Sequence, residues 1–538
     1  MSRPQMCSTV LSAERRHSGV RGRVLAAFIS LLWIAGAVAD VPSIFKPFPD
    51  DSGKVQSATA DPTLNATNKF FDASVGTNGQ ACVTCHQPAQ GFTIHVSVIN
   101  STFAASGGTD PLFRANDTAN NPHTTTTTAD DYSLFLNMGA ARIGKTLPSA
   151  TIANFTVAAA DAATDAKFAA PDHFPLTTDP QHPGVKTLSL FRRPLVNTNV
   201  HLDSSVLWDG RDSITTIATS QVPKAIQGLL TTSNGGNCPG CPGTDPAVNQ
   251  DIAYFMLGVF TDQVFDTAAG TDAAGNCTLT PPGTLCGAGR TFAHGAQAGV
   301  HHLLRLALGP NVPCTNPLEG TSCVPNVPGY DLFDAWANLP LDGEVEDDNI
   351  RNAGRRSVFR GQQLFNTAVL NVPPDLQGLL GTTTHCTGCH ATHNIGNNPS
   401  ATFFARVGTD SLDIINQLLS QSNLSSATLA DLAIYQLEVS QLPQYCLRPI
   451  SSVSSASCGS APGDVVTTDP GRAMVSGNIA DVGKFKPPIL RGLAARSPYF
   501  HAGTAQNIQM LIHFYNARFQ IGLSEDQVND IGAFLEAQ

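Results

Sequence analysis

The chain has 538 residues, of which 42% are hydrophobic and 14% are charged, and its formal net charge at pH 7 is −11. A chain of this length usually divides into more than one core, and this composition excludes a disordered protein. The acidic balance excludes the basic surface of a nucleic-acid-binding protein, and it would suit a basic protein partner.

The N-terminal residues 1–39 have the pattern of a secretory signal peptide. Four arginines between positions 15 and 23 precede an apolar run over residues 24–38, and a small-x-small site ends at Ala39. A retained membrane anchor is the alternative, but the run is short for a bilayer span. We therefore expect an exported, periplasmic protein that is not stably inserted in a membrane after cleavage.

The first motif is Cys82-Val83-Thr84-Cys85-His86, and residues 65–74 before it are predicted to form a short helix. Two thiols three positions apart, followed at once by histidine, are the attachment signature of c-type haem: both sulfurs form thioethers and the imidazole ligates the iron. A single Cys-x-x-Cys pair could instead be a disulfide, a redox pair or half of a zinc site.

The same pattern recurs in the second motif, Cys386-Thr387-Gly388-Cys389-His390. Two occurrences, each with histidine in the same position, predict two covalently bound haem c groups. The attachment residues would be Cys82, Cys85, Cys386 and Cys389, and the axial histidines would be His86 and His390.

Residues 94–188 are rich in Thr, Ala, Asn and Asp, and we predict a long, loop-rich insertion that covers one haem face. Its histidines could each be a distal iron ligand or lie on the surface: His95, His123, His173 and His182.

The next informative block, residues 191–211, ends in Trp208-Asp209-Gly210-Arg211. This places a large redox-capable ring beside a tight turn and a fixed positive charge, although Trp208 could also simply pack in a core. Apolar residues at helical spacing follow over 251–265 and 294–308, and residues 332–339 contain Trp336.

An acidic segment over residues 340–356 is predicted to be an interdomain linker. Beyond it the apolar spacing and the capping residues predict helices over 360–366, 412–419, 426–439 and 524–536.

Eight cysteines remain after the signal and haem cysteines are set aside. They fall in sequence-local pairs that predict four loop disulfides in an oxidising compartment: Cys238 with Cys241, Cys277 with Cys286, Cys314 with Cys323, and Cys446 with Cys458. The connectivity is open, and the first pair could instead be redox-active.

The predicted fold is mainly α, with two cytochrome c-like haem domains carrying long, loop-rich, disulfide-stapled insertions. The N-terminal domain would span residues 40–345 and the C-terminal domain residues 350–538.

In their order, the motifs resemble those of the bacterial di-haem cytochrome c peroxidases and the related MauG-type enzymes. The resemblance rests on the first haem motif, an Arg-x-Pro-like segment ending in Trp-Asp-Gly-Arg, the second haem motif, and a tail with Phe-Lys-x-Pro-x-Leu-Arg and Pro-Tyr-Phe-His-x-Gly. It covers most of residues 65–230 and 355–538 but leaves 94–188 and much of 231–350 unmatched.

The resemblance implies peroxide chemistry at the first haem and electron entry at the second, with Trp208 as a relay between them. Arg211 and Gln221 join Trp208 as candidate catalytic residues. The distal ligand of the second iron would lie fourteen positions after His501, which is Tyr515. His513, Met510 and Met474 remain rival ligands.

The chain also departs from the family. The positions of the peroxidase Gln and Glu correspond to Ala218 and Gly228, neither of which can move a proton. The family's calcium ion is held partly by an Asn before the Pro of the Arg-x-Pro-like segment, which here reads Arg192-Arg193-Pro194. Calcium is therefore an open expectation, because an arginine could supply the positive charge itself.

Three functions follow as hypotheses. The first is peroxidase-like reduction of hydrogen peroxide with electrons from a small redox protein, a cytochrome c or a cupredoxin. The second is oxygenation of an apolar substrate by dioxygen, as in the di-haem rubber oxygenases, which fits the missing proton donor. The third is a non-catalytic di-haem electron carrier, which a histidine ligand from the insertion would produce.

Overall fold

The structure is a computed structural model in which Ser43–Gln538 form one compact unit. The predicted signal peptide and three of the predicted disulfides lie outside the described residues, and the predicted domain boundary near residue 350 stays a prediction. The structure describes residues 44–50, 52–59, 61, 63–75, 79–115, 117–121, 124–149, 151–161, 178–179, 182–200, 203, 205–213, 246–266, 292–293, 330, 332–344, 346–390, 404–452, 459 and 461–538.

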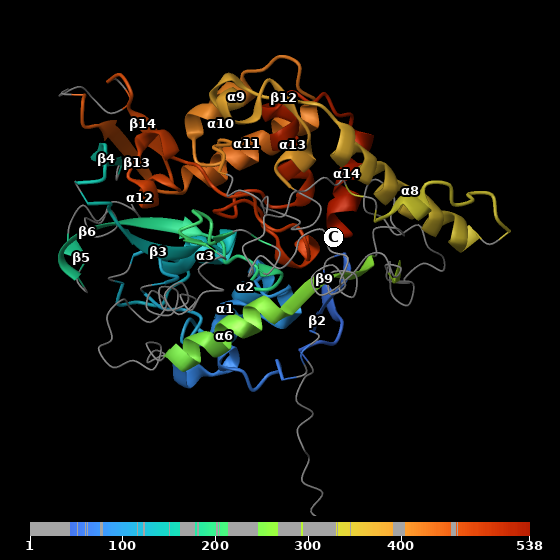
Figure 1. The fold of residues 1–538 in the computed structure, drawn as a ribbon, viewed down its shortest axis with the longest axis horizontal. Coiled ribbons are helices and arrows are strands. Elements are labelled where there is room, and N and C mark those ends of the chain that lie inside the picture. The colour runs from blue at the N-terminus through green and yellow to red at the C-terminus, as the bar shows by residue number, and fades with distance from the viewer. Residues whose placement is uncertain are drawn as a thin grey trace, which may run out of the picture. The chain divides into compact units, whose positions relative to one another are not determined.

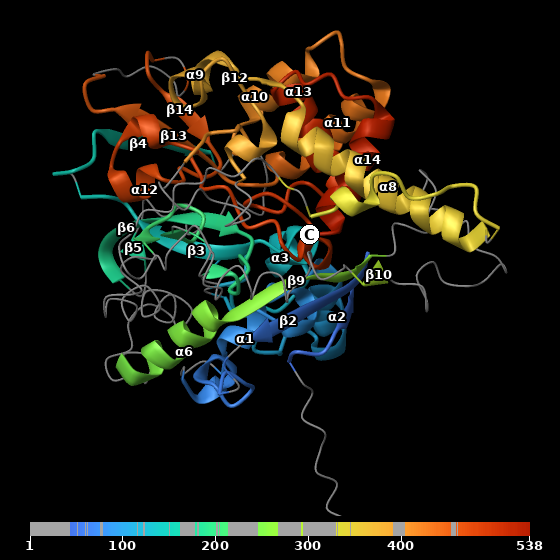
Figure 2. The same ribbon diagram turned by 45° about the vertical axis from the view of Figure 1, so that its right-hand side comes forward.

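A four-stranded antiparallel sheet joins the N-terminal strands to a segment some two hundred residues later (Figure 2). Strands β2 and β9 pair from Gly53 opposite Asp266 to Thr59 opposite Val259, with a bulge between Lys54 and Val55. In order across the sheet the strands are β1 (Phe48–Asp50), β2 (Gly53–Thr59), β9 (Val259–Asp266) and β10 (Phe292–Ala293).

The predicted helix over residues 251–265 is correct only in its first half. Helix α6 (Pro246–Gly258) ends at a glycine, and the chain continues directly as β9. The first residues of β9 are Val259, Phe260 and Thr261, and β-branched and aromatic residues favour strands. Pairing with β2 therefore overrides the helical apolar spacing. The other predicted helix of this region, over 294–308, lies outside the described residues.

The segment before the first motif forms two 3₁₀ turns, Lys69–Phe71 and Ala73–Val75, in place of the single short helix predicted there. Phe70 is fully buried, and its ring stacks on that of Phe255 in α6 with centroids 4.9 Å apart. The same apolar cluster includes the partly buried Cys82. These aromatic contacts fix α6 against the segment that carries the first motif.

The prediction that residues 94–188 are loop-rich is wrong for much of the segment. Short apolar runs between its polar stretches form helices and strands, because they can be buried against one another and against the C-terminal region. The elements are α2 (Val96–Ser106), α3 (Ser133–Met138), β3 (Ala141–Thr146), β4 (Phe155–Asp161), β5 (Thr178–Asp179) and β6 (His182–Arg192).

Strands of this segment contribute to two three-stranded sheets (Figure 1). Strands β3, β6 and β5 form one, and β4 joins β13 (Gln444–Pro449) and β14 (Val465–Thr467) in the other. The β4–β13 pairing runs from Phe155 opposite Pro449 to Asp161 opposite Gln444. The segment is thus an integral part of the fold, and its covering of a haem face stays a prediction.

Helices dominate the C-terminal region. They are α8 (Glu346–Thr367), α9 (Pro374–Leu380), α10 (Leu412–Leu419), α11 (Ser426–Ser440), α12 (Ala473–Ser476), α13 (Ile508–Arg518) and α14 (Glu525–Glu536), with the two-residue strands β11 (Leu370–Asn371) and β12 (Thr383–Thr384) beside α9.

The three helices predicted after the second motif are confirmed as α10, α11 and α14. A serine caps each of them: the side chains of Ser411, Ser425 and Ser524 accept a hydrogen bond from the backbone amide three residues later. In α14 the Gln527 side chain also accepts a hydrogen bond from the Ser524 amide, which completes a capping box.

The prediction of an acidic linker over residues 340–356 is wrong from residue 346 onward. Helix α8 begins at Glu346 and continues through the predicted helix 360–366 to Thr367. The acidic positions 346–348 fall in its first turn, where the helix dipole favours negative charge. The acidic run therefore starts a long helix.

Helices α8 and α14 pack closely at Gly361 (Figure 1). A β-carbon at this glycine would lie 2.8 Å from the Phe534 Cβ and closer still to the backbone of Asp530. The Arg360 guanidinium binds both carboxylate oxygens of Asp530, at 2.7 and 2.6 Å. The helix contact thus depends on the missing side chain of Gly361.

Replacing Gly361 with alanine is expected to lower the free energy of unfolding by about 1–3 kcal/mol, because the added methyl group overpacks the contact. The control is Gly378→Ala in α9, where a β-carbon would meet nothing within 4 Å. That control should be neutral or stabilising by up to about 1 kcal/mol. Urea unfolding of both variants measures the difference, and equal unfolding midpoints would contradict the close helix packing.

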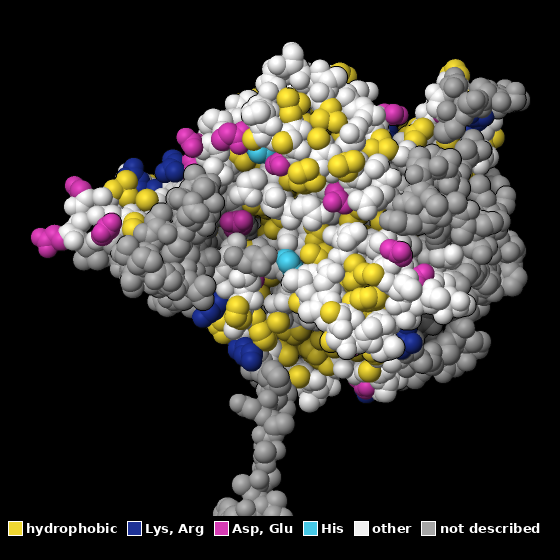
Figure 3. Space-filling view, turned by 180° about the vertical axis from the view of Figure 1, so that it is seen from behind, with side chains coloured by type: hydrophobic (Ala, Val, Ile, Leu, Met, Phe, Trp, Pro, Cys, Tyr) yellow, Lys and Arg dark blue, Asp and Glu magenta, His cyan; other side chains and the backbone are white. Residues whose placement is uncertain are grey.

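The surface shown in Figure 3 carries apolar side chains scattered among charged ones. Among the described residues, no helix combines the length and apolar character needed to cross a bilayer.

Cys446 in β13 is disulfide-bonded. Its predicted partner Cys458 lies outside the described residues, so that pairing stays a prediction.

Candidate active site

The first motif forms a single helical turn, α1 (Cys82–Cys85), and the backbone amide of His86 donates to the Cys82 carbonyl at 2.9 Å. Both thiols are free, so the pair is not closed as a disulfide. Burial raises the pKa of each thiol to about 12. Within the described residues, no three His, Cys, Asp or Glu side chains are arranged to hold a metal ion.

The His86 ring is oriented by the loop that follows it. Its Nδ1 lies 3.1 Å from the Phe92 carbonyl oxygen. Donation from one ring nitrogen to a backbone carbonyl is the arrangement commonly found for histidines that bind metals through the other nitrogen. Burial lowers the pKa of His86 to about 4, so the imidazole is neutral at physiological pH. Phe92 adopts φ +58°, a strained conformation that turns its carbonyl in this direction.

The second motif forms a 3₁₀ turn, Cys386–Gly388, and both of its thiols are also free. The backbone amide of His390 donates to the Cys386 carbonyl at 3.0 Å, as in the first motif. Burial lowers the pKa of the His390 imidazole to about 4, and the nearby charges of Arg496 and Lys486 act in the same direction. Its buried Nδ1 has no hydrogen-bond partner among the described residues.

Tyr515, the first-choice distal ligand, lies beside the second motif. It packs in apolar clusters that include Cys386. Burial raises the pKa of its phenol, and Cys389 and Cys386 add to the effect. Its ring stacks on that of Phe519 with centroids 5.9 Å apart. The structure therefore brings together two segments that are more than a hundred residues apart in sequence.

Two of the rival ligands have other surroundings. His513 directs Nδ1 to Asp431 at 2.7 Å and Nε2 to Glu525 at 3.1 Å. Met474 is buried in a different cluster, with Tyr445 and Leu447. The third rival, Met510, shares a cluster with Cys386 and Tyr515.

Among the histidines of the 94–188 segment, His95 caps α2 with its side chain. Its Nε2 lies 2.6 Å from the Ser497 hydroxyl and its Nδ1 accepts from the Ser97 amide at 3.0 Å, so both ring nitrogens have partners. His123 and His173 lie outside the described residues, and only the backbone of His182 is described, in β6.

Trp208 sits at the tip of a small hairpin between β7 (Ser205–Val206) and β8 (Asp212–Ser213). Its indole Nε1 donates to the Arg193 carbonyl at 2.9 Å. The ring makes edge contacts with Phe485 and His501, at centroid distances of 6.5 and 6.4 Å. The indole is thus fixed by a hydrogen bond and by two rings of the C-terminal tail, a more specific setting than core packing alone.

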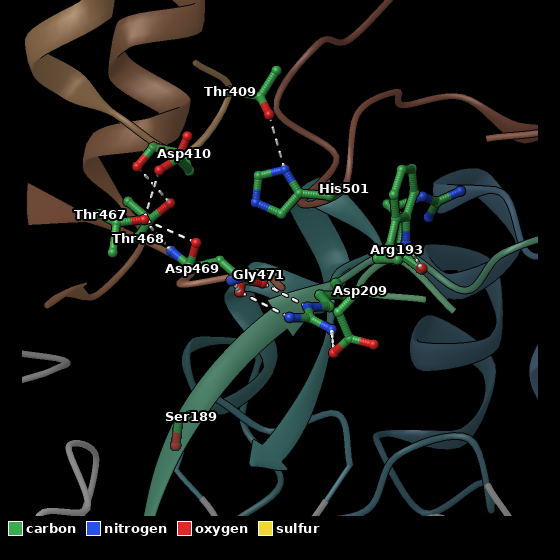
Figure 4. Close-up of polar contacts among 12 residues, drawn as sticks. Ser189, Arg193, Asp209, Thr409, Asp410, Thr467, Thr468, Asp469, Gly471 and His501 are labelled. Carbon is green, nitrogen blue, oxygen red and sulfur yellow. Dashed lines mark hydrogen bonds and ion pairs between the residues drawn. The ribbon is translucent and has the colours of Figure 1, made fainter. Parts of the chain in front are cut away.

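The rings that contact Trp208 are themselves held in place. Phe485 and His501 stack with centroids 4.1 Å apart. His501 is buried, and its Nδ1 lies 3.2 Å from the Thr409 hydroxyl (Figure 4). These contacts hold His501 beside Trp208.

Arg211 binds the residue that precedes the hairpin glycine. Its Nε and Nη2 donate to the two carboxylate oxygens of Asp209, each at 2.9 Å. Asp209 is fully buried, and despite its desolvation the charges of Arg192 and Arg211 hold its pKa well below the usual value. Arg211 therefore stabilises the Trp208 turn, whereas the third candidate catalytic residue, Gln221, lies outside the described residues.

A buried ionic network connects this hairpin to the C-terminal region (Figure 4). Arg192 donates to Asp209 at 2.8 Å and to both carboxylate oxygens of Asp469 at 2.6 and 2.9 Å. A second buried pair joins Lys486 to Asp203 at 2.5 Å. These buried ion pairs thus join residues that precede the second motif in sequence to residues that follow it.

The turn from Pro111 to Ala119 lies along the first motif. Gln80 Nε2 donates to the Pro111 carbonyl at 2.9 Å, and Cys85 packs on the apolar cluster that includes Phe113 and Ala119. The 94–188 segment therefore reaches the first motif through a folded element.

Asp117 in this turn is a residue that the sequence alone does not identify as a candidate. Burial raises its pKa to about 7, although Arg142 and Arg114 oppose the shift, and its charge acts on the Cys85 thiol. A carboxyl that titrates near neutral pH can take up or release a proton in an enzyme. Nothing in the local sequence distinguishes this aspartate, because its pKa is raised mainly by burial, which the sequence pattern does not show.

Replacing Asp117 with asparagine is expected to remove a pH dependence of stability between about pH 4 and about pH 7. The parent carboxyl holds a proton in this window only when folded, so its free energy of unfolding should fall as pH rises through the window. Each pKa unit corresponds to about 1.4 kcal/mol. Urea unfolding at several pH values tests this expectation.

Asp131→Asn is the matched control for this measurement. Although burial acts in the opposite direction, hydrogen bonds from Thr128, Thr126 and Thr124 lower the pKa of Asp131 to about 2. Its stabilising effect is therefore complete above about pH 5, and the variant should be less stable by a constant amount from there upward. Parallel pH profiles for the parent and Asp117→Asn would contradict the burial of Asp117.

Comparison with known proteins defines a general class for part of the chain: it is similar to a cytochrome-c peroxidase. Over 71 residues, 11% of this chain, it is 35% identical to the protein named Cytochrome-c peroxidase IdrP1 from Denitromonas iodatirespirans. The match spans 19% of that protein's length. No family model matches the chain.

Proposed function

We propose that this chain is an exported di-haem c-type oxidoreductase that reduces hydrogen peroxide at the site of the first motif. Its electrons would come from the site of the second motif. The proposal rests above all on two Cys-x-x-Cys-His motifs with four free thiols and two partly buried imidazoles whose pKa is lowered to about 4 by desolvation. The partial similarity to a cytochrome-c peroxidase supports it. A periplasmic location and two cytochrome c-like domains are part of this proposal.

The described residues fit covalent haem. Cys82, Cys85, Cys386 and Cys389 would form the thioether bonds, and His86 and His390 would ligate the irons, with Tyr515 proposed as the distal ligand beside the second motif. When bound, haem supplies a one-electron redox centre at each motif. The chain orients His86 through the Phe92 carbonyl and gives both motifs apolar surroundings, and both features would influence haem potential.

Trp208 is the residue that we propose to relay electrons between the two sites. The backbone amide of Lys486 donates to the Trp208 carbonyl at 3.0 Å, and the charge of Lys486 acts on His390. On its other side, the indole donates a hydrogen bond to the carbonyl of Arg193. Arg193 is the next residue in sequence after Arg192, the centre of the buried ionic network. These contacts support a relay that is held rigidly and lies close to the second motif.

The electron donor is proposed to be a small basic redox protein, a cytochrome c or a cupredoxin, because the chain has a net charge of −11. A complementary charge mainly accelerates association, and this acceleration weakens as salt screens the charges.

The test uses the purified, exported protein with its attached haem. Reduced cytochrome c and reduced cupredoxin are mixed separately with hydrogen peroxide, and oxidation of the donor is followed with and without the protein. We expect oxidation that requires both peroxide and the protein. Protein with two haem groups that oxidises neither donor would reject the proposal.

Two tryptophan variants sharpen this test. Trp208→Phe should retain both haem groups and lose most of the donor oxidation, because phenylalanine is harder to oxidise and has no N–H for the Arg193 carbonyl. Trp336→Phe is the matched control, since Trp336 packs on Phe333 at 4.8 Å and on Arg355, outside the Trp208 contacts. An unchanged rate in the Trp208 variant would reject the relay.

An oxygenase is the second candidate function. It is favoured by Ala218 and Gly228, which replace the residues that handle protons in the family resemblance. This function would be selected if the protein consumed dioxygen in the presence of an apolar substrate and did not consume hydrogen peroxide.

A further inference from the structure

Arg193 is a buried arginine whose guanidinium is surrounded by backbone carbonyls. Its side chain donates to Ile94 O at 2.5 Å, Gly139 O at 3.2 Å, Arg496 O at 3.1 Å and Ser497 O at 3.3 Å. The residue is only 5% exposed. Among the described residues, no carboxylate forms an ion pair with it.

This environment is unusual for a buried charge, which is normally paired with an opposite charge. Here the partners are dipoles: each carbonyl oxygen carries a partial negative charge, and a guanidinium has five N–H donors in a planar fork. Burial and the neighbouring Arg496 lower the pKa of Arg193 to about 9, which still leaves it charged at physiological pH.

The surrounding backbone is shaped to admit this side chain. Gly139 adopts φ +61°, and a β-carbon there would lie 2.9 Å from the Arg193 Cζ and closer still to its Nη1. A β-carbon at Gly503 would lie 3.1 Å from the Arg193 Cδ. Two glycines thus leave the space that the arginine fills.

The backbone of Arg193 forms hydrogen bonds with His501 and Trp208. Its amide donates to the His501 carbonyl at 2.6 Å, and its own carbonyl accepts from the Trp208 indole at 2.9 Å. Arg193 therefore connects Trp208, the 94–139 segment and the 496–501 tail at one point (Figure 4 shows Arg193 and His501).

Calcium does not fit this site. Carbonyl oxygens are typical calcium ligands, but the described oxygens that converge here already accept hydrogen bonds from a fixed cation. We propose that Arg193 is the resident cation of this carbonyl-lined site and that it makes the chain independent of calcium. This inference concerns the architecture and stands whether or not the chain is a peroxidase.

The first experiment uses the unmodified, haem-loaded protein. Its thermal unfolding midpoint is measured after EDTA treatment and again with added calcium chloride, and calcium binding is measured by titration calorimetry. We expect the same midpoint in both states and no heat of binding. A lower midpoint after EDTA that calcium restores would overturn the proposal.

The second experiment removes the cation. Arg193→Ala should lower the unfolding midpoint and leave a carbonyl-lined cavity that free guanidinium can enter. A few millimolar guanidinium chloride should then raise the midpoint of this variant but not that of the parent, whereas sodium chloride at equal ionic strength should not. A midpoint equal to that of the parent without guanidinium would overturn the proposal.

Two further variants keep the test decisive if the alanine protein does not fold. Arg193→Lys retains the charge but reaches fewer carbonyls, so it should be more stable than Arg193→Met, which fills the space without charge. Neither should respond to guanidinium, because the cavity stays filled. A methionine variant as stable as the lysine variant would show that the site needs no cation and would overturn the proposal.

Discussion

Replacing Cys82 and Cys85 together with serine is expected to give a protein that carries one haem group in place of two and that has lost peroxide-dependent turnover. Serine cannot form the thioether bonds, so the first site would lose its covalent cofactor while the second retained its own. Mass spectrometry of the exported protein measures the attached groups, and donor oxidation measures the turnover.

The complementary variant replaces Cys386 and Cys389 with serine. It should also carry one haem group. It should no longer oxidise the protein donor, because electrons are proposed to enter at the second site. Full turnover in either double variant, or a parent mass with no added haem, would reject the assignment of the two motifs.

Replacing Arg192 with methionine is expected to lower the free energy of unfolding by about 3–5 kcal/mol, the cost of breaking a buried ion pair on one side. Arg192, Asp209 and Asp469 have side chains that are at most 2% exposed. Asp209 would keep Arg211, but Asp469 would lose the guanidinium that binds both of its carboxylate oxygens. Urea unfolding measures the loss.

Arg360→Met is the control for this variant. Arg360 binds both oxygens of Asp530 in a similar geometry, but its side chain is 53% exposed. An exposed pair contributes about 0.2–1 kcal/mol, so this control should change little. Adding Asp469→Asn to Arg192→Met should recover part of the loss by removing the unpaired charge. Equal effects of the two arginine variants would contradict the importance of burial.

The parts of the fold that depend on local chemistry could be predicted from the sequence. Helices α10, α11 and α14 combine apolar residues at helical spacing with a serine cap, and both signals lie within one segment. The structure of residues 251–265 cannot be predicted in the same way, because an apolar run is compatible with a helix or a strand. The strand in its second half depends on pairing with β2, two hundred residues earlier.

The candidate site could be predicted only where a motif identifies a residue by its type and spacing. The two Cys-x-x-Cys-His motifs belong to this group, whereas Tyr515 follows from the family resemblance; the structure places Tyr515 in an apolar cluster with Cys386, and its role as a ligand stays a proposal. The partners of Arg192 and Arg193 could not be predicted, since Asp469 and Arg496 are nearly three hundred or more positions away. Asp117 could not be found either, because burial gives it its unusual pKa.

The pairing of β4 with β13 has a consequence for biosynthesis. Strand β4 leaves the ribosome long before Gln444–Pro449 is made, so until then its backbone amides and carbonyls lack the neighbour that they have in the finished fold. An unpaired strand edge can associate with other chains. A nascent or truncated chain that stops short of residue 444 would therefore be prone to aggregation. A chaperone that binds this strand edge would raise the yield of the complete protein.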